Sequence, residues 1–160
     1  MVTLEQPALQ NAEMIWRFRN DTATRRELGW KAISYGDCLA WIADCVSGKI
    51  GQTLFLVRDG KIGDVGFVMF DDDTLTGVRQ IRVSIGPAFR GKGYGQQAIK
   101  LATTIGETEL PQPVNRRLIA NVRAENYKAV FAFESAGYVE VQSFVGPDKI
   151  EYLEFEYKQT

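Results

Sequence analysis

The sequence predicts an α/β (α+β) fold: a central mixed, mostly antiparallel sheet with helices on both faces. Three observations lead to this prediction. Apolar segments with the alternation of strands follow one another between residues 53 and 85, with turn signals between them. Segments with helical spacing precede this region and interrupt it afterwards. The resulting order, βααβββαβαββ, combines antiparallel hairpins with one strand–helix–strand unit, and such a mixture places helices on both sides of one sheet.

The length and composition are those of an ordinary globular domain. The chain has 160 residues, of which 45% are hydrophobic and 24% charged, so we expect residues 1–160 to form one domain. The net charge of −1 creates no basic field for nucleic acid or anionic membranes. No segment approaches the roughly 20 apolar residues of a membrane span, and residues 1–5 do not resemble a signal peptide. We therefore expect a cytoplasmic protein without nucleic-acid or membrane partners.

The N-terminal third predicts a short strand and two helices. The strand lies around residues 3–4, and helical spacing of apolar residues extends from 8 to 19. Residues 21–33 are polar and indicate either a loop or a short irregular helix. A second helix begins after Ser34, which forms a capping-box pair with the residue three positions on, and it ends at Ser47-Gly48.

Three strands follow. The first covers residues 53–57 and leads through the turn signal Asp59-Gly60 into a second strand at 65–70. The third covers 78–85 and ends at Gly86-Pro87, because proline cannot donate to a ladder. Alternation divides the side chains of this third strand between two faces: Ile81, Val83 and Ile85 on one, and Gln80, Arg82 and Ser84 on the other.

The remainder of the chain predicts the strand–helix–strand unit and a closing hairpin. A helix is expected at 93–105, a buried strand at 118–122 and a further helix at 126–136. The hairpin pairs residues 138–144 with residues 151–157.

Cysteine and histidine usage limits the chemistry. The chain has no histidine, which excludes Ser–His and Cys–His mechanisms and any imidazole general base. Cys38 and Cys45 lie seven residues apart on a predicted helix, about 10 Å from each other, which is too far for a disulfide. We expect both to be reduced core residues, and we expect no metal site.

The glycine-rich segment between the third strand and the next helix predicts an anion site. Gly91, Gly93 and Gly95 let the backbone turn tightly and approach a ligand closely. The helix that begins there directs its first free N–H groups into the loop, and Arg90 and Lys92 add charge. The spacing fits neither a Walker loop nor a Rossmann fingerprint. A purely structural turn remains the alternative reading.

Two motifs in register resemble the GNAT superfamily of acetyltransferases. Arg90, Gly93 and Gly95 match the signature Arg/Gln-x-x-Gly-x-Gly/Ala, and the preceding Ile85-Gly86-Pro87-Ala88-Phe89 matches the family's usual lead-in. A second family motif is similar to Asn126-Tyr127-Lys128-Ala129, followed by Phe133 and by Gly137-Tyr138. The resemblance implies the GNAT fold, with acetyl-CoA as co-substrate and an amine as acceptor.

The resemblance also implies where acetyl-CoA lies: in a V-shaped gap between the strand ending at Ile85 and the strand 118–122. The pantetheine arm would pair with the backbone there like an added strand, and the loop amides would hold the pyrophosphate. The implied cofactor-binding residues are Val83, Ile85, Arg90, Gly91, Lys92, Gly93, Tyr94, Gly95, Gln96, Asn126 and Phe133.

The proton-transfer groups depart from the family pattern. The resemblance implies direct attack of an amine on the thioester, with the backbone N–H near Ile85 acting as an oxyanion hole. Phe133 stands where the family often has a tyrosine that protonates the thiolate, and Gln80 stands where it often has a glutamate.

Three explanations are compatible with these departures. Ordered water organised by Gln80 and Ser84 relays protons; another carboxylate acts as base; or the protein is a non-catalytic acyl-CoA-binding or regulatory module. The candidate bases are Glu125, Asp72 and Asp73.

The acceptor side is less specific in the sequence. Residues 16–21, with Trp41, resemble the branch that acetylates amino sugars and ribosomal-protein N-termini. The implied acceptor is a primary amine of a small molecule, with an amino sugar preferred, or a protein N-terminus. Trp30 is a candidate for the acceptor pocket. The aromatic residues of the closing hairpin fit core packing or a dimer surface equally well, so both a monomer and a homodimer are compatible with the sequence.

Overall fold

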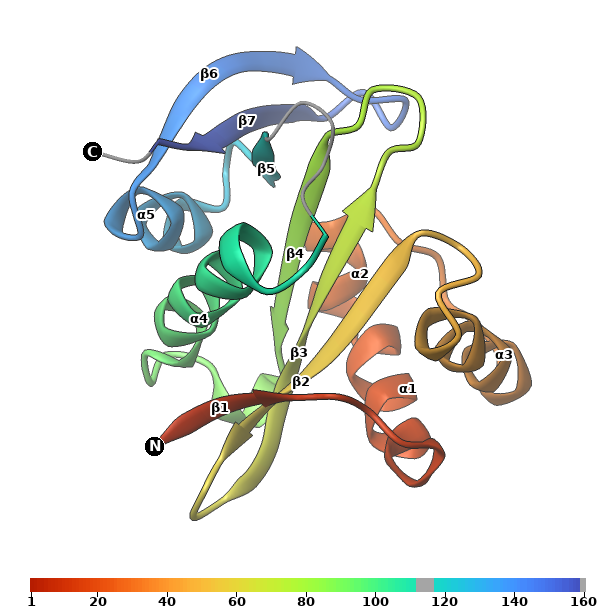
Figure 1. Cartoon of the computed structure of the whole chain (residues 1–160). Coiled ribbons are helices and arrows are strands. Elements are labelled where there is room, and N and C mark those ends of the chain that lie inside the picture. Colours follow the sequence, from red (N-terminus) through yellow and green to blue (C-terminus); the bar gives the residue numbers. More distant parts are fainter. Residues whose placement is uncertain (112–116, 159–160) are drawn as a thin grey trace.

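A twisted sheet crosses the whole molecule. The computed structural model describes residues 1–111 and 117–158. Within these residues the sheet has the strand order β1-β2-β3-β4-β5-β7-β6 (Figure 1). The strands are β1 (Val2–Glu5), β2 (Gln52–Asp59), β3 (Gly63–Asp72), β4 (Arg79–Ile85), β5 (Leu118–Arg123), β6 (Tyr138–Val145) and β7 (Glu151–Tyr157).

Helices cover both faces of the sheet, as the sequence predicts. Helices α4 and α5 lie on one face, and α1, α2 and α3 lie on the other (Figure 1). The α-helices are α1 (Ala12–Asn20), α2 (Thr22–Leu28), α3 (Tyr35–Val46), α4 (Tyr94–Thr108) and α5 (Tyr127–Ser135), with the 3-10 turns η1 (Leu9–Asn11) and η2 (Pro87–Phe89). Each face has its own hydrophobic core, one beneath α4 and α5 and one beneath α1 and α3.

The β4–β5 pair is the parallel pair of the sheet. The two strands pair only at their beginnings, Arg79 with Leu118 and Gln80 with Ile119. The neighbouring pairs β3–β4 and β5–β7 are antiparallel along most of their length. Beyond Gln80, therefore, β4 and β5 leave a gap in the middle of the sheet.

The segment after α1, which the sequence left open between a loop and a helix, forms α2. Asp21 caps this helix by accepting a hydrogen bond from the N–H of Thr24 at 3.0 Å. Gly29 ends it in the left-handed region, with φ of 70°. The helix predicted at 8–19 begins instead with the η1 turn and is α-helical only from Ala12.

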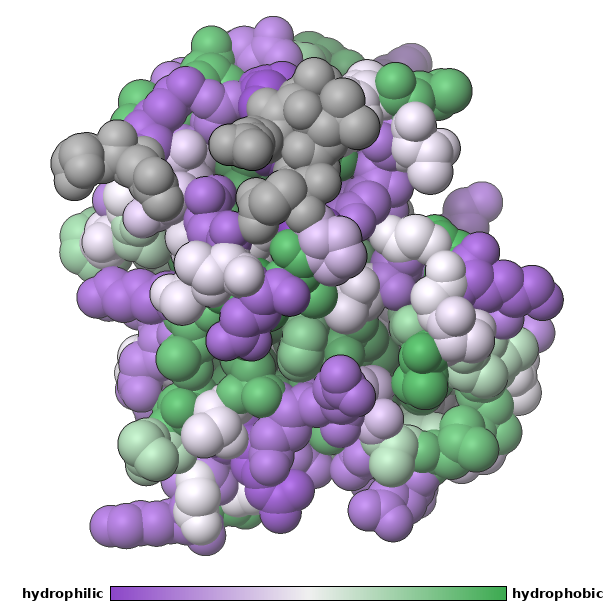
Figure 2. Space-filling model, viewed as in Figure 1, coloured by the Kyte–Doolittle hydropathy of each residue, from purple (hydrophilic) through white to green (hydrophobic). Residues whose placement is uncertain are grey.

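The cysteines and the distribution of apolar residues can be compared with what the sequence predicts. Cys38 and Cys45 are both free and buried, as predicted. In the part of the chain that the structure describes, no helix has the length and apolar character needed to cross a bilayer. On the face seen in Figure 2, hydrophobic residues interrupt a largely hydrophilic surface, and a group of them lies at the lower right, over α1 and α3.

Candidate functional site

The exposed backbone of β4 faces the gap in the sheet. The N–H of Gly86 donates to the carbonyl of Val65, at 2.8 Å, on the β3 side. Because N–H and C=O groups alternate in direction along a strand, those of Val83 and Ile85 point the other way, toward β5. Beyond Gln80 no β5 residue pairs with them. The end of β4 thus offers strand hydrogen bonds to a ligand.

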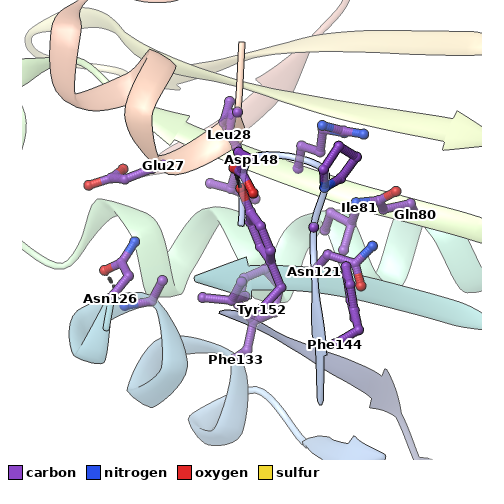
Figure 3. Close-up of a pocket in the computed structure, with 17 residues that line it drawn as sticks. Glu27, Leu28, Gln80, Ile81, Asn121, Asn126, Phe133, Phe144, Asp148 and Tyr152 are labelled. Atoms are coloured by element: carbon purple, nitrogen blue, oxygen red, sulfur yellow. Dashed lines mark hydrogen bonds between the residues drawn. The ribbon is translucent and has the colours of Figure 1, made fainter. Parts of the chain in front are cut away.

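A cavity of 360 Å³ occupies this gap (Figure 3). It passes between the two faces of the sheet, because side chains on both faces of β4 and β5 line it. Its wall consists of residues 80–83 of β4, 121–122 of β5, 126, 129 and 133 of α5 and its N-cap, 27–29 at the end of α2, and 144, 146–148 and 152 of the closing hairpin. We refer to the part beside α5 as the α5 half and to the part beside α2 and the hairpin as the α2 half.

The glycine loop lies just after the end of β4 and has the geometry of an anion site. Gly91 and Gly93 have φ of 76° and 85°, in the left-handed region that favours glycine. From Arg90 to Gln96, the backbone N–H groups donate no hydrogen bond to any acceptor in the described part of the chain. These free donors stand at the start of α4, a helix of 15 residues, whose dipole favours negative charge.

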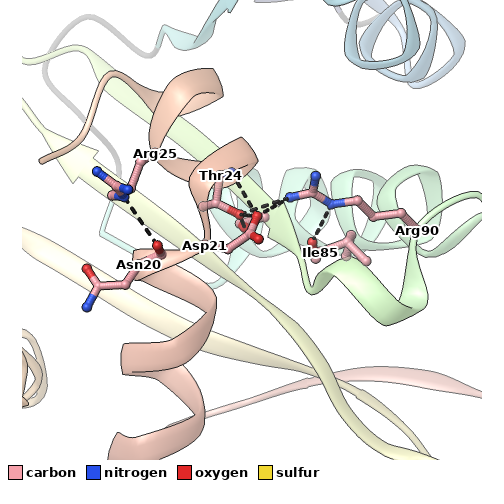
Figure 4. A network of polar contacts seen from close by, with 7 residues as sticks. Asn20, Asp21, Thr24, Arg25, Ile85 and Arg90 are labelled. Atoms are coloured by element: carbon pink, nitrogen blue, oxygen red, sulfur yellow. Dashed lines mark hydrogen bonds and ion pairs between the residues drawn. The ribbon is translucent and has the colours of Figure 1, made fainter. Parts of the chain in front are cut away.

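The side chain of Arg90 is turned away from this loop. Its Nε donates to the carbonyl oxygen of Ile85 at 3.0 Å, and its Nη2 donates to Thr24 Oγ1 at 2.9 Å and to Asp21 Oδ2 at 3.2 Å (Figure 4). Arg90 therefore ties the loop and the end of β4 to the start of α2. Its charge is paired with a carboxylate, whereas Lys92 is exposed on the loop.

Two other predicted site residues also have their side chains in the interior. Ser84 Oγ lies 3.2 Å from Thr24 Oγ1, buried beneath α2. The hydroxyl of Tyr94 donates to Asp59 Oδ2 at 2.7 Å and holds the start of α4 on the β2–β3 hairpin. This hydrogen bond is the main reason why the pKa of Tyr94 is raised. Tyr94 therefore contributes only its backbone to the loop.

On the α5 half, the structure brings two of the predicted cofactor-binding residues, Asn126 and Phe133, to the cavity wall. Asn126 caps α5 by accepting from the N–H of Ala129 at 3.3 Å, so its Oδ1 is engaged by the helix. Phe133 is 5% exposed and packs edge-on against Tyr138, with ring centroids 5.1 Å apart. The hydroxyl of Tyr138 lies elsewhere, 2.7 Å from Thr103 Oγ1, and burial raises its pKa. Among the described residues that line the α5 half, none has a hydroxyl to replace the tyrosine hydroxyl that is absent at Phe133.

On the α2 half, the cavity contains a tyrosine–carboxylate pair that the sequence analysis missed. The hydroxyl of Tyr152 donates to Asp148 Oδ2 at 2.6 Å. Figure 3 shows the Tyr152 ring in the middle of the view, between Asp148 and Phe133. Burial, and then this hydrogen bond, raise the pKa of Tyr152, while the same bond lowers the pKa of Asp148. In the sequence, Tyr152 has only the pattern of an apolar residue of the closing hairpin.

None of the three predicted candidate bases lines the cavity. Asp72 is paired with the buried Arg79 at 2.7 Å, Asp73 accepts turn amides, and Glu125 is paired with Arg26 and Arg123. The carboxylates on the cavity wall are instead those of Glu27 and Asp148.

Trp30, the candidate for the acceptor pocket in the sequence, packs against the core instead of this cavity. Its ring stacks on Phe67, with centroids 6.0 Å apart and planes at 2°, in the core beneath α1 and α3. Trp30 does not contribute to the wall of the cavity.

Comparison with known proteins identifies relatives of this arrangement. Residues 2–139 match the family model described as an acetyltransferase (GNAT) domain. A sequence comparison with curated proteins finds no match. The structure of spermidine N-acetyltransferase from Vibrio cholerae in complex with CoA and spermine is similar, with a TM-score of 0.81 at 19% identity over 97% of this chain and 94% of that chain.

Two further solved structures have the same fold. An acetyltransferase (GNAT family) from Bacillus anthracis has a TM-score of 0.79 at 16% identity, over 97% of this chain and 93% of that one. A putative phosphinothricin N-acetyltransferase has a TM-score of 0.77 at 17% identity, over 99% of this chain and 98% of that one.

Proposed function

The chain belongs to the GNAT family of acetyltransferases, and we propose that it transfers the acetyl group of acetyl-CoA to a primary amine of a small molecule. The observation that carries the proposal is the end of β4, where the backbone of Val83 and the N–H of Ile85 have no partner on β5, next to a cavity and to a loop of free amides. A volume of 360 Å³ lies in the range of sites for small molecules. An amino sugar is the preferred acceptor, and a protein N-terminus is the other candidate.

In this proposal acetyl-CoA enters from the α5 half. The pantetheine arm pairs with the backbone of Val83 as an added strand would, which leads the thioester to the N–H of Ile85, and the amides from Arg90 to Gln96 bind the pyrophosphate. Asn126 lies on the same wall, and its Nδ2, which has no hydrogen-bond partner among the described residues, is available to the pantetheine. The ring of Phe133 supplies an apolar wall beside it.

The acceptor amine attacks the thioester carbonyl from the α2 half. The N–H of Ile85 donates to the oxyanion that forms, as in an oxyanion hole. The carbonyl of Ile85 accepts from Arg90 at 3.0 Å, which holds the end of β4 in place. The C–S bond then breaks, the thiolate takes a proton to leave as CoA thiol, and the nitrogen loses one to become the amide.

Water is the best-supported route for these protons. Tyr152 has the hydroxyl in the cavity, but donating its proton would leave a tyrosinate 2.6 Å from the Asp148 carboxylate. Two negative charges at that distance repel strongly, so Tyr152 is a poor proton donor. Gln80 lines the cavity and offers both a donor and an acceptor to ordered water. Ser84, buried beneath α2, would act only through the backbone that it helps to fix.

Two measurements test the proposal. Calorimetric titration with acetyl-CoA should show micromolar binding that Gly93→Glu abolishes, because the new carboxylate would stand among the free amides and repel the pyrophosphate. Release of CoA thiol should then depend on an added amine.

The alternative function is a non-catalytic acyl-CoA-binding module, which Phe133 and Gln80 favour. Binding without thiol release for any amine would establish that alternative. Absence of binding by the folded wild type would refute both functions.

A further inference from the structure

Two arginines lie together beneath α1 and α3, next to the α2 half of the cavity. Arg82 comes from the middle of β4 and lines the cavity, with 22% of its side chain exposed. Arg19, from α1, lies behind it, with its guanidinium 4.4 Å from the Trp30 ring and 4.2 Å from the Trp41 ring. The guanidinium of Arg82 lies 5.9 Å from the same Trp30 ring. Both guanidiniums therefore lie near the Trp30 ring.

These two arginines have too few acidic neighbours to pair both of their charges. The carboxylate of Asp71 lies 3.9 Å from Arg82 Nη2, beyond hydrogen-bonding distance, and it also accepts from the amide of Gln52 at 3.4 Å. Among the described residues, Nε of Arg82 and both Nε and Nη1 of Arg19 are buried without a hydrogen-bond partner. Burial lowers the pKa of both guanidiniums, and Arg82 lowers that of Arg19 further.

A buried guanidinium without a paired anion is costly, so this arrangement favours binding of a negative group. Arg82 is the member of the pair that a ligand can reach, because it lines the cavity whereas Arg19 lies among the tryptophans. Asn121, also on the wall, has a buried Oδ1 without a partner in the described residues. That oxygen accepts but cannot donate, and it suits an N–H or O–H group of the same ligand.

The carboxylates of the cavity lie on two other elements. Glu27 is at the end of α2, and Asp148 is in the turn of the closing hairpin. Asp148 is kept ionised by the hydrogen bond from Tyr152 and by the N–H of Ile150, at 3.1 Å. The α2 half therefore combines one cation with two carboxylates, which is a complement to a molecule bearing both signs of charge.

We infer that the acceptor is an amine that also carries an anionic group, a carboxylate or a phosphate, and that Arg82 binds this group by charge-assisted hydrogen bonds. Glu27 and Asp148 attract the ammonium form of the amine into the cavity, where it loses one proton to water before it attacks as the neutral amine. A planar guanidinium suits both kinds of anion. This inference rests on the proposed function and narrows its substrate class. It disfavours a purely cationic acceptor, because such a molecule leaves the Arg82 guanidinium without an anion.

Matched acceptor pairs test the charge requirement on the wild-type enzyme. L-phenylalanine is compared with 2-phenylethylamine, which lacks the carboxylate, and glucosamine 6-phosphate with glucosamine. We expect kcat/KM, measured by CoA thiol release, to be at least 10-fold higher for the anionic member of one pair. The pair that responds distinguishes a carboxylate from a phosphate. Ratios below 3-fold in both pairs, or spermidine as the best acceptor, would overturn the inference.

Substitution of Arg82 tests whether this side chain causes the preference for anionic acceptors. In Arg82→Gln, KM for the preferred anionic acceptor should rise at least 10-fold, and the ratio of kcat/KM between the anionic acceptor and its neutral partner should fall at least 5-fold. Arg82→Lys should recover part of the loss. Arg17→Gln is the matched control, since Arg17 lies exposed on α1 with Glu13 as its partner. An equal loss for both members of the pair would contradict binding of the anion by Arg82.

A binding measurement separates this inference from the proposed function. Inorganic phosphate is titrated against the protein saturated with CoA, so that the glycine loop is already occupied. We expect phosphate to raise Tm of the wild type and of Arg17→Gln, but to raise Tm of Arg82→Gln by less than half as much. That result with no thiol release for any amine would refute the acetyl transfer and leave the anion site standing. Equal Tm increases in all three proteins would refute the anion site.

Discussion

Replacement of Gly95 by alanine should raise the stability of the protein and lower its affinity for acetyl-CoA. Gly95 is the second residue of α4, and its φ lies outside the left-handed region. A Cβ built on it meets no atom within 4 Å, so the folded protein accommodates the methyl group without strain. The same methyl group would stand among the amides that we assign to the pyrophosphate. The substitution therefore separates a structural glycine from a ligand-binding one.

The expected size of each effect follows from this geometry. Alanine in place of a helical glycine stabilises by about 0.7 kcal/mol, mainly by restricting the unfolded chain. For a chain of 160 residues the entropy of unfolding is about 0.34 kcal/mol per degree, so Tm should rise by about 2 °C. A displaced pyrophosphate should weaken binding at least 10-fold, which corresponds to about 1.4 kcal/mol.

Gly36 provides a matched control on another helix. It is the second residue of α3, it follows a tyrosine as Gly95 does, and the nearest atom to its added Cβ is Ser34 Oγ at 4.0 Å. Gly36→Ala should raise Tm by a similar amount and leave the Kd of acetyl-CoA unchanged. The assays are thermal unfolding of the free protein and calorimetric titration with acetyl-CoA. Unchanged affinity in Gly95→Ala would refute the assignment of the pyrophosphate to this part of the loop.

Three further substitutions test the framework of the site. Arg90→Gln should destabilise the protein by about 2 kcal/mol, because Asp21 loses a charged partner at 3.2 Å. A double-mutant cycle with Asp21→Asn, measured by urea unfolding, should give a coupling energy of about 1 kcal/mol. Additive effects of the two substitutions would contradict the pairing. Gly66→Ala should cost about 2 kcal/mol, because its Cβ would overlap a β4 carbonyl oxygen; an unchanged unfolding midpoint would refute that contact. Tyr152→Phe should remove the stabilisation that comes from the lowered pKa of Asp148. This contribution is present above the ordinary pKa of about 3.9 and is lost as pH falls through the lowered value, so the stability difference between wild type and variant should shrink below pH 4; a constant difference would contradict it.

The elements that the sequence predicts well are those whose signals are local. Strand β4 alternates polar and apolar residues from Gln80 to Ile85, and β3 contains the continuous apolar run from Phe67 to Phe70. The structure extends the strand predicted at 65–70 to Gly63–Asp72, and it begins the strand predicted at 78–85 one residue later, at Arg79. The sequence does not decide between a loop and a helix for α2, because the contacts that stabilise this helix come from residues far along the chain. Its cap, Asp21, is held by Arg90, which is 69 residues further along the chain. A polar seven-residue segment gives no periodic signal strong enough to predict such a helix.

The two halves of the cavity also differ in how far the sequence predicts them. The α5 half can be predicted from a single continuous motif, residues 126–138, which brings Asn126 and Phe133 to the cavity wall. The α2 half is assembled from α2, β4, β5 and the hairpin turn, and each contributes one or two residues that look ordinary in the sequence. Glu27 is one charge in a charged helix, and Asp148 is a turn residue. Only their convergence on one cavity makes them candidates for function.

Phe133 shows how the departures from the family pattern are connected. Its ring is stacked on Phe155, with centroids 6.4 Å apart, and edge-on to Tyr138. At this position the cavity wall is therefore aromatic and carries no hydroxyl. The hydroxyl that does reach the cavity, from Tyr152, is committed to Asp148, and the resulting pair is suited to attracting a cationic amine rather than to protonating a thiolate. The proton chemistry is consequently left to water, while the protein side chains of the α2 half act on the charge of the acceptor.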